Sequence, residues 1–156
     1  EARTNDGQRM LAVNDLFIGP KSHSSARYTL SWQGKCEQQS SSGVIVSTGF
    51  GSTGWFQSVL AGAMGVAKAQ GHKLRDGFGW DEKRLQFSVR EPFPSQTSGT
   101  ELVFGAVTRK APLKLESLMP ENGVIFSDGI EADYLAFNAG MVVEVGVADV
   151  VGRLVC

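Results

Sequence analysis

Residues 40–58, which read S-S-S-G-V-I-V-S-T-G-F-G-S-T-G-W-F-Q-S, decide how the rest of the chain is interpreted. The β-branched run at 44–46 predicts a strand, a glycine-rich loop follows it, and a helix is expected to begin with its cap at Ser52 or Thr53. A strand, a glycine-rich turn and a helix N-terminus in this order bring backbone N–H groups up to a ligand. The stretch is neither a Walker A loop, since no Gly-Lys-Ser/Thr follows, nor a G-x-G-x-x-G dinucleotide fingerprint. The residues alone indicate either a ligand-binding turn or a tight turn that closes a helix onto a sheet.

The composition sets limits on domain number and on partners. The chain has 156 residues, of which 42% are hydrophobic and 20% charged, and this length suffices for one domain with its own core. A net charge of −1 provides no basic surface for nucleic acid or an anionic membrane. No apolar run approaches the ~20 residues that span a bilayer, and no signal peptide opens the chain. Two distant cysteines, Cys36 and Cys156, favour reduced thiols in an intracellular protein over a disulfide.

Short apolar runs separated by turn signals make up most of the chain. An Asn-Asp-Gly within residues 3–9 predicts a hairpin turn, and alternation over residues 28–32 predicts a strand. Further strands are expected at residues 85–90, 101–108, 110–116, 124–126, 134–137, 141–147 and 153–155. Residues 37–42 are interpreted as a polar segment that leads into the central stretch. Regular short strands of this kind predict a mainly β fold, either an antiparallel β-sandwich or a layered β domain.

One helix is expected to be inserted into this β domain, at about residues 52–70, with Gly71 just beyond its C-terminus. Apolar residues at helical spacing form a broad face along it, which predicts a largely buried helix. Each glycine inside it costs ~1 kcal/mol relative to alanine, a loss that is tolerable where small residues allow close approach of a sheet or another chain. Only the first turn, residues 53–58, is expected to contact a ligand.

The apolar run of residues 10–19 is broken in its middle by Asn14 and Asp15. Two adjacent polar residues in such a run fit a bulge or the exposed end of a strand. They also fit a site in which the amide and the carboxylate point into a pocket and hydrogen-bond a polyol. A carboxylate suits ribose because it accepts hydrogen bonds from two vicinal hydroxyls at once. The residues alone leave both interpretations open.

Taken together, these motifs resemble those of the NAD kinases. G-S-T-G-W after S-G-V-I-V-S-T is similar to the family's D-G-x-x-x-x-T-P-T-G-S-T-A-Y signature. Asn14 and Asp15 in L-A-V-N-D-L-F-I-G are similar to its Asn-Glu pair. The F-I-G after the acidic pair, the S-S-G before the strand and a later R-E-P resemble the mitochondrial-type branch of the family. Counterparts run from about residue 11 to residue 156, so the resemblance covers nearly the whole chain.

In that family a second, mostly β domain holds the NAD substrate, and the resemblance implies the same role here. Asn14 and Asp15 correspond to the pair that binds the adenosine, although Asp is one methylene shorter than Glu. Trp55 replaces a Tyr and keeps a stacking surface for a purine or nicotinamide ring. Gly49 and Phe50 replace Pro-Thr in the turn, which makes it more flexible and less polar.

The remaining implied contacts are polar. Thr53 and Ser58 match positions that hydrogen-bond the base or the ribose, and Ser42 stands where most of the family has Asp. Asp128, in a late Asp-Gly, matches a turn that reaches back toward the substrate, while the same dipeptide by itself predicts an ordinary turn. The complete set of implied NAD-binding residues is Asn14, Asp15, Ser42, Thr48, Thr53, Trp55, Ser58 and Asp128.

The implied reaction transfers the γ-phosphoryl group of ATP, with Mg²⁺, to the 2′-hydroxyl of the adenosine ribose of NAD, giving NADP. The family's catalytic aspartate lies in a Gly-Gly-Asp-Gly motif of a preceding α/β domain. Asp-Gly occurs here at 6–7, 76–77 and 128–129, never after Gly-Gly. The chain also begins at Glu1 without an initiator Met. We therefore expect a piece of a longer polypeptide that contains the β-rich domain without the α/β domain, has no catalytic residue or metal ligand, and is inactive alone.

Two alternatives to the kinase domain stay open at the level of sequence. One is a non-catalytic β-sandwich module that binds a nucleotide or a sugar. The other is a structural domain whose glycine-rich helix packs against a partner subunit. The resemblance further implies a homo-oligomer, a dimer or tetramer, in a bacterial cytoplasm or a mitochondrial matrix, with NAD as its small-molecule partner and with neither nucleic acid nor membrane as a partner.

Overall fold

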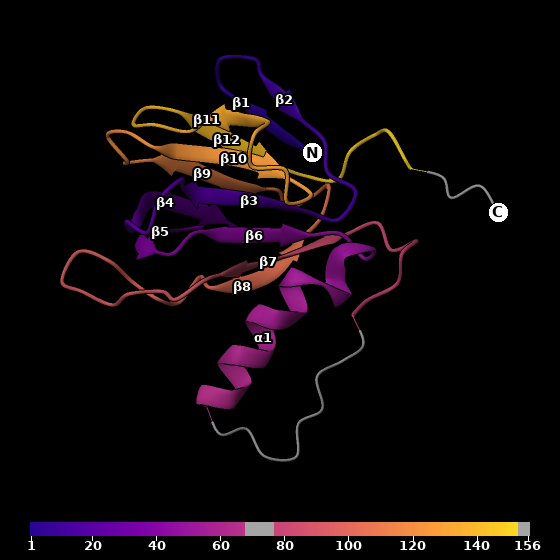
Figure 1. Ribbon diagram of the computed structural model, residues 1–156, viewed down its shortest axis with the longest axis horizontal. Helices are drawn as coiled ribbons and strands as arrows, with labels where there is room; N and C mark the ends of the chain where they lie inside the picture. The colour runs from indigo at the N-terminus through magenta and orange to yellow at the C-terminus, as the bar shows by residue number, and fades with distance from the viewer. Residues whose placement is uncertain (68–76, 153–156) are drawn as a thin grey trace.

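The computed structural model describes residues 1–67 and 77–152, which form two antiparallel β-sheets and one α-helix. Each sheet has six strands, and the helix lies against the outer face of one of them (Figure 1). The mainly β, sandwich-like fold that the short alternating runs predict is confirmed. No helix in the described ranges has the length and hydrophobicity that a membrane crossing requires.

The first sheet has the strand order β2-β1-β12-β9-β4-β5. Its strands are β1 (Ala2–Thr4), β2 (Arg9–Met10), β4 (Ala26–Trp32), β5 (Lys35–Ser41), β9 (Leu113–Ser117) and β12 (Val142–Val145). Buried and exposed residues alternate strictly along β9, because one face of this sheet covers the core and the other is solvated. β1 and β2 form the hairpin that Asn-Asp-Gly predicts, with Gly7 at φ +89° in its turn.

The second sheet has the strand order β11-β10-β3-β6-β7-β8. Its strands are β3 (Asp15–Pro20), β6 (Val44–Ser47), β7 (Leu85–Val89), β8 (Phe104–Val107), β10 (Gly123–Ser127) and β11 (Tyr134–Ala136). All four residues of β6 are buried, and so are the first five of β3. These central strands are apolar at consecutive positions because both of their faces are covered.

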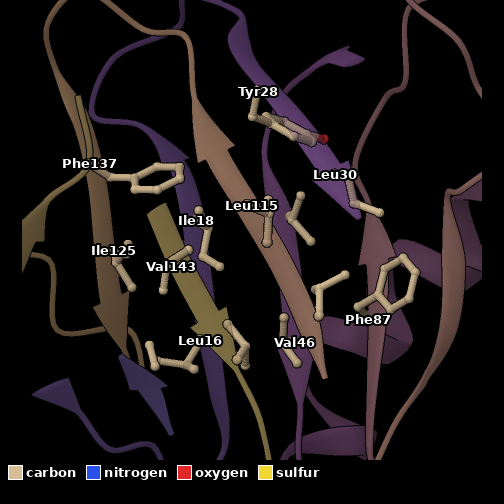
Figure 2. Packing of buried hydrophobic residues seen from close by; sticks show 14 of the residues in the cluster. Leu16, Ile18, Tyr28, Leu30, Val46, Phe87, Leu115, Ile125, Phe137 and Val143 are labelled. Carbon is tan, nitrogen blue, oxygen red and sulfur yellow. The ribbon is translucent and has the colours of Figure 1, made fainter. Parts of the chain in front are cut away.

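The main core fills the space between the two sheets (Figure 2). Leu16 and Ile18 of β3 face this core together with Leu115 of β9 on the opposite sheet. Tyr28 is also fully buried there, and its hydroxyl lies 2.8 Å from the Ser41 Oγ, so its polar atom is hydrogen-bonded. Core packing therefore fixes the register of β3, and with it the position of Asp15 at the start of that strand.

A second, smaller cluster lies on the outer face of the second sheet, beneath α1 (Trp55–Val66). Phe17 of β3, Ile45 of β6 and Phe126 of β10 pack there against Phe56 of the helix. These are the alternate residues of strands whose other faces fill the sandwich core. The helix therefore docks directly over the strands that lead into the glycine-rich turn.

The helix differs from its prediction in two respects. It begins at Trp55, after a 3-10 turn at Gly51–Thr53, and its N-cap is Gly54 without a side-chain capping bond. Among its residues only Phe56 is buried, and Val66 is 88% exposed, so the expectation of a largely buried helix is wrong. The periodicity of the sequence indicates that the helix has an apolar face, but not whether another part of the protein covers that face. In Figure 1 only the first turns of α1 lie near the sheet, and the rest of the helix extends away from it.

Residues 37–41 of the segment interpreted as a polar approach to the central stretch belong to the edge strand β5, a strand that the sequence pattern does not predict. Only Gln39 and Ser41 of β5 are buried, so polar side chains suffice for most of this strand. The buried Gln39 is held by hydrogen bonds from its Nε2 to Leu102 O (3.1 Å) and to Glu37 Oε2 (2.5 Å). The predicted helix end at 68–70, Gly71, the strand at 153–155 and Cys156 lie outside the described residues.

Candidate functional site

A cavity of about 380 Å³ opens where β3 begins and where α1 follows the glycine-rich turn. This volume is within the range of small-molecule sites, roughly 300–1,000 Å³. The residues that line it are Asn14, Asp15, Phe50, Gly51, Thr53, Gly54, Trp55, Asp128 and Gly129. They come from three segments that are far apart in the sequence. Five of the eight residues implied by the resemblance therefore lie at one cavity, and Asn14 and Thr53 share it.

The glycine-rich turn is held tightly against the segment that carries Asn14. A Cβ added at Gly51 would lie 2.2 Å from the Asn14 carbonyl oxygen, so no larger residue fits there without moving the backbone. The Thr48 hydroxyl donates to Val13 O (2.6 Å) and to Asn14 O (3.0 Å) and accepts from the Gly51 N–H (3.2 Å). Thr48 therefore fixes the turn rather than facing the cavity.

Asp128 anchors the same segment from the other side. It follows β10, has a left-handed backbone at φ +54°, and directs its carboxylate at three successive N–H groups. Its Oδ1 accepts from Val13 N (3.1 Å), Asn14 N (2.6 Å) and Asp15 N (3.3 Å), and its Oδ2 accepts from Val13 N (3.0 Å). Consecutive N–H groups that converge on one carboxylate form a small anion-binding nest. Asp128 lines the cavity, yet its oxygens are engaged within the protein.

Asp15 has the opposite character, because its carboxylate lines the cavity and has no hydrogen-bond partner among the described residues. The residue is 7% exposed, and within residues 1–67 and 77–152 no donor is hydrogen-bonded to its side chain. Burial, and second the negative charge of Asp128, raise the pKa of Asp15 above its ordinary value. A ligand that presents hydroxyl groups in the cavity would supply the donors that this largely buried residue lacks within the described part of the chain.

Two further polar side chains at the cavity have no hydrogen bond within the described part of the chain. The Asn14 amide makes none, although its backbone N–H and carbonyl are both engaged. The Thr53 hydroxyl likewise makes none and is exposed. A carboxylate, an amide and a hydroxyl therefore remain available on one surface, and together they can both accept and donate hydrogen bonds.

Trp55 lines the cavity with a ring that also contacts other parts of the protein. Its ring lies nearly parallel to Phe17 (centroids 5.5 Å apart, 14° between planes) and to Phe126 (6.4 Å, 16°). The Arg90 guanidinium lies 5.3 Å from its centroid, at cation–π distance. These contacts fix the orientation of the indole at the helix N-terminus.

The three other predicted contacts are not among the residues that line the cavity. Thr48 lies in the turn as described above. Ser42 lies beyond the opposite end of β6, where its hydroxyl donates to the Glu91 carboxylate. Ser58 is exposed on α1, and its hydroxyl donates to Gly54 O at 3.4 Å.

Phe50 is the lining residue that sequence reasoning left without a role. Its only signal is that an aromatic residue replaces a threonine of the resembled signature. It is 44% exposed, which is unusual for a large apolar ring in a well-packed turn.

The charge of the cavity is negative. Among the nine residues that line it, two are aspartates and none is basic. A neutral, hydroxyl-rich group fits such a surface better than a phosphate does. The described residues contain no group of three His, Cys, Asp or Glu side chains that could hold a metal ion.

Comparison with known proteins gives a structural likeness without a sequence match. No protein-family model and no curated protein sequence matches the chain. Among solved structures, an NAD kinase from Archaeoglobus fulgidus in complex with ATP aligns over 92% of this chain and 49% of its own, with 16% identity and a TM-score of 0.58. Yeast NADH kinase complexed with NADH aligns over 92% of this chain and 38% of its own, with 13% identity and a TM-score of 0.61. The chain thus has the fold of one part of these proteins and spans half of their length or less.

Proposed function

We propose that this chain is the NAD-binding domain of an NAD kinase, of the mitochondrial-type branch that its motifs resemble. The whole enzyme would transfer the ATP γ-phosphoryl group to the 2′-hydroxyl of the adenosine ribose of NAD, releasing ADP and NADP. The observation that carries the proposal is that the Asp15 carboxylate, the Asn14 amide and the Thr53 hydroxyl line one cavity and have no hydrogen-bond partner among the residues that the structure describes. The shared fold with an NAD kinase and an NADH kinase supports it.

In this proposal each available group has a separate task. Asp15 accepts hydrogen bonds from the ribose hydroxyls, which compensate the burial of its charge. Asn14 and Thr53 supply a donor and acceptor for the adenine edge or the ribose. The diphosphate of NAD stays away from Asp15 and Asp128, since both repel it. The binding free energy orients the 2′-hydroxyl for attack, which is the main contribution a phosphoryl-transfer enzyme makes apart from charge stabilisation.

The chain is proposed to position the acceptor and not to activate it. A base near the 2′-hydroxyl and the phosphoryl donor site are assigned to another part of the whole enzyme. Since the described residues offer no ligand set for Mg²⁺, no step is assigned to a metal on this chain. Oligomerisation as a dimer or tetramer remains part of the proposal and rests on the resemblance alone.

Isothermal titration of the 156-residue chain with NAD tests the proposal. Asp15→Asn keeps the shape of the side chain and removes the second acceptor oxygen, so we expect NAD affinity to fall at least tenfold. The matched control is Asp133→Asn, an exposed carboxylate that does not line the cavity, and it should leave the affinity unchanged. Equal affinity of Asp15→Asn and the wild-type chain would refute the assignment.

Two further measurements separate the proposal from a non-catalytic binding module. Titration with glucose and ribose in place of NAD identifies a simple sugar-binding domain, which would bind these sugars as tightly as NAD. Incubation of the chain with NAD, ATP and Mg²⁺ should yield no NADP. Formation of NADP by the chain alone would show that it contains a base that the proposal does not assign.

A further inference from the structure

An exposed aromatic pair lies at the edge of the cavity. Phe50 lines the cavity and is 44% exposed, and Trp80 is 67% exposed. Their ring centroids lie 5.0 Å apart with 63° between the planes, an edge-to-face arrangement. We call Phe50 and Trp80 the aromatic rim. Two large rings exposed side by side at a polar cavity indicate a surface for a flat apolar group.

The aromatic rim is held in place by contacts beneath it. The Phe78 N–H donates to the Ser52 Oγ at 3.0 Å, which ties the segment carrying Trp80 to the glycine-rich turn. A Cβ added at Gly49 would lie 2.1 Å from the Gly79 carbonyl oxygen, so the two backbones touch at that point. The glycines of the turn thus dock two segments: Gly51 receives the segment with Asn14, and Gly49 the segment with Trp80.

Trp55, the ring expected to stack on the ligand, is half-buried and is therefore less exposed than Phe50. Phe17 and Phe126 lie nearly parallel to it, and the Arg90 guanidinium lies 5.3 Å from its centroid. Phe50, in contrast, is 44% exposed, and its described aromatic neighbour, Trp80, meets it at an angle and leaves a ring face uncovered by that contact. Of the two rings that line the cavity, Phe50 is therefore the better placed to receive a planar group.

We propose that Phe50, supported by Trp80, stacks the adenine ring of the nucleoside whose ribose hydroxyls bind Asp15. This inference rests on the proposed function and adds a base subsite to it. The aromatic rim next to a carboxylate matches the two chemical halves of adenosine, a flat heteroaromatic ring and a vicinal diol. Stacking of this kind is tolerant of the base, so the rim selects a ring and Asp15 selects the sugar.

NMR titration of the full 156-residue chain with adenosine, ribose and NAD tests the base subsite. Phe50→Ala should weaken adenosine and NAD about tenfold, the usual size of one lost base–aromatic stack, and should leave ribose binding unchanged. Phe50→Tyr keeps the ring and should restore affinity. Phe93→Ala is the matched control, since Phe93 is 63% exposed and does not line the cavity. Ligand-dependent quenching of tryptophan fluorescence should be reduced in Trp80→Phe.

The outcomes distinguish this inference from the proposed function. If Phe50→Ala binds adenosine and NAD like the wild-type chain while Asp15→Asn binds them weakly, the base subsite is refuted and the NAD-binding role stands. An equal loss for ribose and adenosine in Phe50→Ala would show a distorted turn and would also refute stacking. If the wild-type chain binds adenosine but not NAD, the proposed function fails. The effect of Phe50→Ala on adenosine binding then decides by itself whether the aromatic rim stacks the base. Binding of neither compound refutes both.

Discussion

The two ends of β6 carry similar polar residues in opposite states. At its start Ser42 donates to the Glu91 carboxylate, and the Arg90 N–H donates to Gly43 O at 2.8 Å, so these groups satisfy one another. At its other end lies Asp15, the residue paired with Ser47, and its carboxylate faces the cavity without a described donor. Polar groups that satisfy each other hold a fold together, whereas polar groups left without partners at a cavity are available to a ligand. Under the proposed function, the difference between the two ends therefore assigns stability to one and ligand binding to the other.

Substitution of Gly51 by alanine should have the largest effect on the end of β6 that lies at the cavity. The added Cβ would lie 2.2 Å from the Asn14 carbonyl, a backbone atom that cannot move without displacing β3. We expect a loss of about 3 kcal/mol in the free energy of unfolding, measured by urea denaturation, together with loss of NAD binding. The control is Gly62→Ala in α1, where an added Cβ meets nothing within 4 Å and alanine favours the helix by up to ~1 kcal/mol. Similar losses in both variants would contradict the close approach.

Removal of the Asp128 carboxylate tests the anchor of the same end. Asp128→Ala leaves three N–H groups, those of residues 13–15, without their acceptor, and we expect a loss of about 2 kcal/mol in the free energy of unfolding. NAD affinity should fall as well, because the Asn14 and Asp15 side chains lose their fixed position. Glu91→Ala at the other end of β6 removes one exposed hydrogen bond and should cost about 0.5 kcal/mol without changing NAD affinity. A larger effect of Glu91→Ala than of Asp128→Ala would reverse the comparison.

Asp15→Asn should separate stability from binding at the cavity end. Burial raises the folded-state pKa of Asp15 above 3.8. Below pH 3.8 the side chain is protonated in both the folded and the unfolded protein, so it does not lower the free energy of unfolding. As the pH rises from 3.8 through the raised pKa, the folded protein loses stability. The neutral asparagine avoids this loss, so at neutral pH we expect the variant to be more stable than the wild-type chain while NAD binding falls. The difference in melting temperature between variant and wild type should shrink as the pH is lowered toward 3.8. A variant that is less stable at neutral pH would show that the carboxylate is satisfied in the free protein.

The fold follows from the sequence more completely than the site does. Alternation and turn signals predict most strands, and the continuous apolar runs of β3 and β6 reflect burial on both faces. The edge strand β5 gives no such signal, because its buried residues are polar and depend on hydrogen bonds such as that from Gln39 to Leu102. The sequence also does not predict that most of α1 is exposed, because an apolar helix face has the same periodicity whether or not other residues cover it.

The sequence predicts the candidate site residues that stand out by residue type, but it does not predict roles that depend on contacts formed in the folded chain. Asn14, Asp15 and Thr53 are polar residues beside apolar runs, and the structure brings them to one cavity. Asp128 was expected to reach the substrate, but its three backbone partners are 113 to 115 residues away in sequence and appear only in the folded chain. Ser42 and Asp15 likewise look alike as polar residues next to apolar runs, and their partners alone separate them.

Ser42→Ala is the smallest and most discriminating change. The resemblance implies that Ser42 contacts NAD, whereas the structure gives its hydroxyl to Glu91 and does not include it among the lining residues. Loss of one partly exposed hydrogen bond should lower the free energy of unfolding by about 0.5 kcal/mol or less and leave NAD affinity within twofold of wild type. Calorimetric titration and urea denaturation of the same sample measure both quantities. A clear loss of NAD affinity would mean that the ligand reaches along the whole of β6, and the division of this strand into a stabilising end and a binding end would then be wrong.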